Sequence, residues 1–147
     1  MQIKKIMVLV LSFLIIGSVV TVNAYAEDLS PIVESEDVSE YVNVQSISNT
    51  LTISSTTAYC DSICTGFSNV VRITAVQTLQ KFWGLWIWDN VDGGCWTDTV
   101  NSASIGVSHT KNGLSNGTYR LKTDFTITTS SGQVETITIY SSERTVD

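Results

Sequence analysis

"TYRLKTDFTITT", residues 118–129, carries a clear alternating pattern of apolar and polar residues. Every second residue from Tyr119 to Ile127 is apolar except Thr123, and charged or hydroxyl-bearing side chains stand between them. A period of two residues is typical of a β-strand that buries one face. We therefore expect an extended strand here, with Tyr119, Leu121 and Phe125 facing the core.

The same alternation recurs along the chain, less regularly towards residue 140. It is found in residues 46–54, 56–64, 71–82, 103–110 and 133–141. For residues 71–82 it places these side chains on one face: Val71, Ile73, Ala75, Gln77 and Leu79. The segments are rich in Val, Ile and Thr, which favour strands, and none shows a helical period. The pattern predicts an all-β sandwich or barrel.

Two short segments indicate how the last strands are connected. "SSGQ", residues 130–133, is typical of a hairpin turn, with Gly132 available for positive φ. "LSNGTYRL" places Tyr119 two residues before Leu121 and resembles the tyrosine corner of immunoglobulin-like sandwiches, in which Leu121 would stand where antibody domains have Cys. An ordinary tyrosine at the start of a strand is the alternative.

Longer segments carry a resemblance to a family. "TAYC…CTGFSNVVRITAVQTLQK" and "GTYRLKTDFTITTSSGQVETITIYS" resemble small exported proteins of Gram-positive bacteria with one β-sandwich domain of unknown function. The resemblance covers about residues 45–142 and is most specific at "LQK" and in the last hairpin. It implies an immunoglobulin-like Greek-key sandwich of about seven strands and an exported location. It supplies no catalytic residues.

The N-terminal 26 residues have the layout of a secretory signal peptide. Lys4 and Lys5 precede an apolar run over residues 6–22, and Ala24 and Ala26 form an A-x-A cleavage site. A retained membrane anchor is the alternative. We expect a signal-peptide helix at 1–26, a disordered acidic leader at 27–43 and the sandwich domain at 44–147.

The net charge of the chain limits the classes of molecule that it is expected to bind. Cleavage after Ala26 would leave six basic and fourteen acidic residues, and six of those acids lie in the leader. Nucleic acid needs clustered Lys and Arg, so we expect no nucleic-acid partner. The C-terminal "YSSERTVD" has no hydrophobic tail. We expect a secreted or loosely surface-associated protein that meets the membrane only through its signal peptide, with its oligomeric state open.

Cys60, Cys64 and Cys95 are the three cysteines of the chain. Cys60 and Cys64 on one strand would lie ~13 Å apart, beyond disulfide reach. If "DGGC" returns to the end of the sandwich that holds Cys64, a Cys64–Cys95 disulfide would form; three free thiols are the alternative. This cysteine spacing with the single His109 matches no zinc motif, and we expect no metal or cofactor.

Catalytic groups are sparse. His109 falls in an expected strand, and no cysteine has a nucleophile context. Asp89, Asp92 and Asp98 flank the tryptophans, but their separation is not readable from sequence. "DNVDGG", residues 89–94, fits a turn better than a calcium loop. We expect no enzymatic activity.

"FWGLWIWDN", residues 82–90, holds three of the four tryptophans and is apolar on both faces if extended. One face can fill the core, and the other must be covered or used. The candidate ligand-binding residues are Trp83, Trp86, Trp88 and Asp89. We expect a binding module for a cell-wall or host glycan or a surface protein. The alternative function is a membrane-active exported toxin or bacteriocin-like protein.

Overall fold

The computed structural model describes residues 38–147. The expected signal peptide and residues 27–37 of the expected leader lie outside the described residues. A short 3-10 helix, η1 (Val38–Glu40), precedes eight strands. No helix among residues 38–147 has the length and apolar character needed to cross a bilayer.

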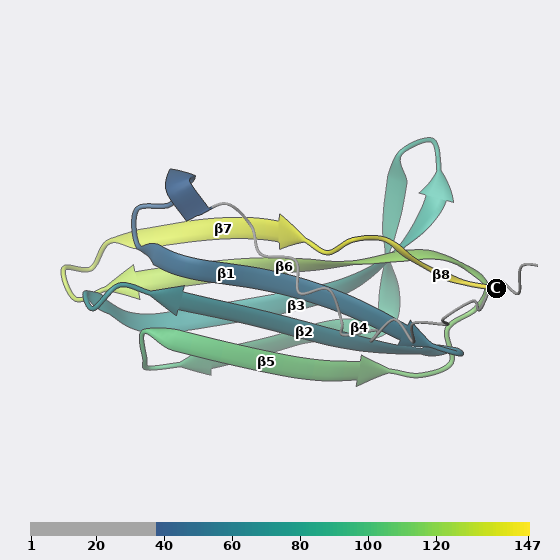
Figure 1. The fold of residues 1–147 in the computed structure, drawn as a ribbon, viewed down its shortest axis with the longest axis horizontal. Coiled ribbons are helices and arrows are strands. Elements are labelled where there is room, and N and C mark those ends of the chain that lie inside the picture. Colours follow the sequence, from purple (N-terminus) through teal and green to yellow (C-terminus); the bar gives the residue numbers. More distant parts are fainter. Residues whose placement is uncertain (1–37) are drawn as a thin grey trace, which may run out of the picture.

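All eight strands belong to two antiparallel sheets that pack face to face (Figure 1). The first sheet has the order β1 (Val44–Ser54), β2 (Thr57–Gly66), β5 (Ser104–Lys111). The second has the order β4, β3, β6, β7, and β8 pairs with the start of β6. Its strands have these bounds: β3 (Val70–Gly84), β4 (Ile87–Val100), β6 (Gly117–Thr129), β7 (Val134–Tyr140) and β8 (Arg144–Val146).

The apolar side chains that alternate along the strands fill the space between the two sheets. Along β6, Tyr119, Leu121 and Phe125 are at most 1% exposed, and Ile127 is fully buried. Val71 is the exception to the expected faces: it is exposed, because the pairing of β3 with β6 shifts between Val70 and Arg72. An irregularity of this kind adds one residue to a strand and reverses the phase before it.

A buried polar network joins the two sheets through Asn49 of β1. Its Nδ2 donates to the carbonyl oxygens of Leu121 at 2.9 Å and Ile139 at 3.3 Å. Its Oδ1 accepts from the hydroxyls of Ser62 at 2.8 Å and Thr123 at 3.0 Å. The polar residue that interrupts the apolar face of β6 therefore has a buried partner. Within residues 38–147 no buried side-chain nitrogen or oxygen lacks a hydrogen bond.

Tyr119 makes the contact expected of a tyrosine corner. Its hydroxyl donates to the carbonyl oxygen of Ser115 at 2.6 Å, four residues back along the chain. The hydrogen bond fixes the connection from β5 into β6, where Gly117 begins the strand. Gly132 has φ 82° in the turn between β6 and β7, as its position in "SSGQ" predicts.

The segment just before β1 is attached to the sandwich. Glu135 of β7 accepts hydrogen bonds from the backbone amides of Val42 and Asn43 at 3.1 and 3.0 Å. Val38 and Tyr41 pack against the core. The described fold therefore begins several residues before residue 44.

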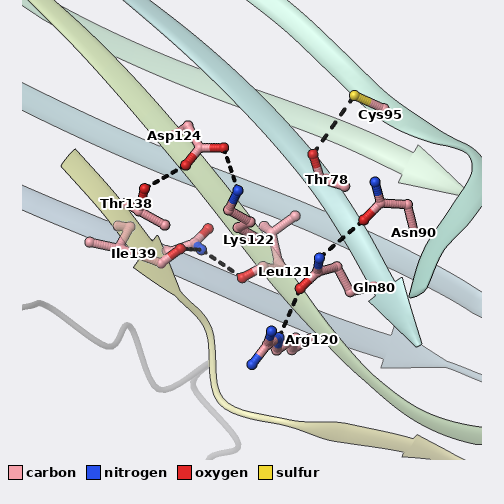
Figure 2. Close-up of polar contacts among 11 residues, drawn as sticks. Thr78, Gln80, Asn90, Cys95, Arg120, Leu121, Lys122, Asp124, Thr138 and Ile139 are labelled. Atoms are coloured by element: carbon pink, nitrogen blue, oxygen red, sulfur yellow. Dashed lines mark hydrogen bonds and ion pairs between the residues drawn. The ribbon is translucent and has the colours of Figure 1, made fainter. Parts of the chain in front are cut away.

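The expected Cys64–Cys95 disulfide is absent, and all three thiols are free. Cys64 lies in β2 with its side chain fully buried between the sheets. Cys95 lies opposite Thr78 in the middle of β4, and its thiol is 3.7 Å from the Thr78 hydroxyl on an exposed part of the strand (Figure 2). The prediction assumed that "DGGC" reaches the end of the sandwich, whereas Cys95 stands part-way along it.

Candidate ligand-binding site

The strands β3 and β4 continue past the rest of their sheet. Pairing of β3 with β6 ends at Lys81 opposite Tyr119, so residues 82–88 pair only with one another. We call residues 82–88 the distal hairpin. In Figure 1 it is the teal loop that rises away from the body of the sandwich.

The distal hairpin turns at Leu85 and Trp86. Both residues have positive φ, at 50° and 65°, and Gly84 before them has φ 94°. A two-residue turn with both central residues at positive φ is of type I′, for which Asn-Gly is the favoured pair. Each L-residue with a side chain in this region costs roughly 1–2 kcal/mol. The turn is therefore strained, and it holds two large apolar side chains at the apex.

A cavity of about 170 Å³ lies at the base of the distal hairpin. Trp83 and Asp89, two of the four candidate ligand-binding residues, line it. The segment that connects β5 to β6 closes the other side. The remaining lining residues are Lys81, Asn90, Val91, Lys111, Gly113, Leu114, Ser115 and Tyr119.

The cavity combines an aromatic surface with charges. Lys81 donates from Nζ to the Ser115 hydroxyl at 2.7 Å, and the same nitrogen lies 5.6 Å from the ring centre of Tyr119. An ammonium group has three donors, so Lys81 retains two for a ligand. Lys111 and Asp89 form no ion pair with any residue of 38–147. The site therefore offers donors, an acceptor and the Trp83 ring, which is 70% exposed.

Trp88 lies on the opposite face of the hairpin, away from this cavity. Its ring packs on Phe82, with centroids 5.2 Å apart, and the guanidinium of Arg120 lies 4.1 Å from its centroid. The same guanidinium lies 4.3 Å from the ring centre of Tyr140. Arg120 also donates to Gln80 at 2.9 Å, as Figure 2 shows. Trp88 thus supports the neck of the hairpin on the outer face of the sheet.

Among the large hydrophobic residues of 38–147, Trp86 is the most exposed, at 93%, and Leu85 follows at 89%. Neither residue lines the cavity. The four candidate residues therefore occupy three places: Trp83 and Asp89 at the cavity, Trp86 at the apex and Trp88 on the outer face.

The "DGG" segment forms a bulge inside β4 rather than a turn between strands. Pairing with β3 passes from Gln80–Asn90 to Thr78–Cys95. Gly93 has φ 65°, and a side chain on Gly94 would lie 3.1 Å from Cβ of Leu79. The bulge brings Val91 and Asn90 to the cavity wall.

His109 belongs to a separate cluster on the inner side of β5. Its ring stacks on Trp96, with centroids 5.0 Å apart. Nε2 lies 3.5 Å from the carboxylate of Asp98. The amide nitrogen of Gln77 already donates to Ser62 at 2.7 Å, so Oε1 of Gln77 accepts from Nδ1 of His109 at 2.8 Å. His109 therefore connects Asp98 to the buried network.

Cys60 lies opposite His109 across the β2–β5 pair. Burial, with a smaller contribution from the charge of Asp61, raises the pKa of the Cys60 thiol to about 12. The thiol stays protonated at neutral pH, so it is a poor nucleophile. No group of three or more His, Cys, Asp or Glu within residues 38–147 is arranged to hold a metal ion.

Sequence reasoning missed the cationic half of the cavity. Lys81 directly precedes the aromatic run and could have been included on that ground. Lys111 comes from β5, and nothing in its local sequence links it to Trp83. Only the closure of the two sheets brings these residues together.

No known protein family, curated protein or solved structure matches this chain.

Proposed function

We propose that the chain is an exported, non-catalytic recognition module that binds the terminal unit of an extracellular glycan in the cavity below the distal hairpin. The observation that carries the proposal is the joint lining of one cavity by Trp83, Asp89, Lys81 and Lys111. A tryptophan ring stacks on the apolar face of a sugar, and nearby charged groups bind its hydroxyls.

The size and charge of the cavity narrow the ligand class. At about 170 Å³ it is smaller than the ~300–1,000 Å³ typical of pockets for drug-sized ligands, so one sugar ring is the expected occupant. Two lysines against a single Asp89 favour an acidic sugar, whose carboxylate would accept hydrogen bonds from Lys81 and Lys111.

The fold and the N-terminal sequence support the setting. The order β1-β2-β5 against β3-β6-β7 supports an immunoglobulin-like Greek key, as does the hydrogen bond of Tyr119. With the signal-peptide layout of residues 1–26, this agrees with the proposed kinship to exported Gram-positive β-sandwich proteins.

Binding of immobilised acidic sugars, neutral sugars and peptidoglycan to variants tests the proposal. We expect Trp83→Ala and Lys111→Ala each to weaken binding at least tenfold with an unchanged melting temperature, because both side chains are at the surface and line the cavity. Trp86→Ala is the matched control: it removes an exposed indole from the same hairpin but not from the cavity. Equal losses for Trp83→Ala and Trp86→Ala, or no binding by the parent chain, would reject the cavity as the site.

A further inference from the structure

The apex of the distal hairpin has a different character from the cavity at its base. Leu85 and Trp86 are 89% and 93% exposed, and Ile87 beside them is 52% exposed. All three residues belong to the free end of a hairpin that projects from the sandwich (Figure 1).

Two features of the apex raise the free energy of the folded chain. Large apolar groups face water, and two L-residues hold positive φ in a turn that Asn-Gly would form without strain. Strain of this kind is typically found at functional sites. The cost of placing Leu85 and Trp86 in this turn favours a contact role for the apex over a purely structural one.

We propose that the apex inserts into the interfacial layer of a lipid bilayer, with Leu85 and Trp86 as the inserted side chains. Tryptophan prefers the boundary between headgroups and acyl chains, where its ring is in an apolar layer and its N–H is hydrated. The proposal is independent of the glycan cavity because neither residue lines it.

The length of the hairpin fits this depth. From Phe82 to the turn the strand rises three residues, which is ~10 Å at ~3.3 Å per residue. Interfacial segments bury their apolar face ~5–10 Å deep, whereas a full span needs ~30 Å. The Arg120 guanidinium lies against Trp88 at the neck, and Lys81 lies at the base. Both cations would then stand at headgroup level.

The area that the apex can bury is small for a stable contact with a protein partner. A standard interface buries ~800 Å² on each partner. Two tryptophans supply ~150–250 Å² each when fully buried. Trp83 and Trp86 with Leu85 and Ile87 stay short of that area, so the apex alone would not hold a second copy of the chain. A bilayer needs no matching concave surface.

The test uses the chain from residue 27 onward, which is the product expected from cleavage after Ala26, because the apolar run of residues 6–22 would itself bind lipid. The parent chain should sediment with phosphatidylcholine vesicles, and its tryptophan emission should shift to shorter wavelength. The chain carries net negative charge, so adding anionic lipid should not strengthen sedimentation.

The double variant Leu85→Asn with Trp86→Gly is the decisive change. It gives the turn its favoured residues, so the melting temperature should be equal or higher, while vesicle partitioning should fall at least tenfold. Val134→Ser, at an exposed apolar site near the opposite end of the sandwich, should leave partitioning unchanged (Figure 1). Lys111→Ala should likewise retain vesicle binding, which separates this proposal from the glycan site.

Three outcomes would overturn the proposal. The parent chain could fail to sediment with either lipid composition, or the double variant could sediment as well as the parent. In the third, the parent chain would not bind vesicles but would self-associate without lipid in a concentration-dependent way, and the double variant would not self-associate. That result would assign the apex to a second copy of the chain.

Discussion

At the scale of single residues, Cys60 and Cys64 act as small apolar groups. Burial raises the pKa of each thiol from its ordinary value of 9.0 to about 12, with smaller contributions from the charges of Asp61 and Glu135. In the unfolded chain both thiols are hydrated and keep the ordinary value. Between pH 9 and 12 the unfolded chain therefore loses these protons while the folded chain retains them.

This difference predicts a stability loss at alkaline pH. The stabilisation is complete below pH 9, and the free energy of unfolding falls as pH rises towards 12, by ~1.4 kcal/mol per pH unit for each thiol. Urea denaturation at about pH 8 and about pH 10.5 should show a smaller fall for Cys60→Ala with Cys64→Ala than for the parent chain. Lysine and tyrosine ionisation is common to both proteins and cancels. Equal falls would show that neither thiol carries the effect.

At the scale of elements, Tyr119 fixes the entry into β6. Tyr119→Phe removes its hydroxyl and leaves the Ser115 carbonyl without that donor. We expect a loss of ~1–3 kcal/mol in the free energy of unfolding, with an unchanged denaturant slope. Tyr59→Phe is the control, because Tyr59 is 44% exposed and its hydroxyl has no partner within residues 38–147. A loss of equal size in both variants would contradict the role of the corner.

The hairpin β3–β4 shows where elements could be predicted from sequence and where they could not. Alternation over residues 71–82 predicts the inner face correctly from Ile73 to Leu79. The turn carries no Asn, Asp or Gly at its centre, so nothing in Leu85–Trp86 indicates a reversal. "DGG" has the composition of a turn but forms a bulge, because the strand it interrupts stays paired on both sides of it.

At the scale of the whole molecule, Asn49 is one of the polar residues that connect the two sheets. Asn49→Ala would remove four buried hydrogen bonds, which join Asn49 to the carbonyl oxygens of Leu121 and Ile139 and to the hydroxyls of Ser62 and Thr123. We expect a loss of ~2–4 kcal/mol in the free energy of unfolding, since each of the four lost hydrogen bonds contributes ~0.5–1.5 kcal/mol. Chemical denaturation measures it, and Asn112→Ala, which removes only an exposed contact with Thr57, should change stability by under ~0.5 kcal/mol. A similar small change for Asn49→Ala would show that water replaces the side chain.

The all-β class and the packing of two antiparallel sheets follow from local alternation, which one strand such as β6 already displays. The cavity could not be predicted from local alternation. It requires Lys111 of β5 beside Trp83 of β3, and the distance between them depends on how the two sheets pack against each other. The absent disulfide has the same origin: pairing along β4 depends on the bulge between Asn90 and Cys95, which no spacing rule reveals.

The hydrogen bonds from the backbone amides of residues 42 and 43 to Glu135 attach the N-terminal side of the described chain to β7. This attachment determines how the molecule would be oriented on a surface. In Figure 1, η1 lies towards the left end of the sandwich and the distal hairpin towards the right end, and both rise on the same side of it. A chain immobilised through residues 42 and 43 would therefore hold Leu85 and Trp86 towards the other end of the long axis, away from the attachment. Immobilisation of this kind gives sensors and force probes unobstructed access to the apex.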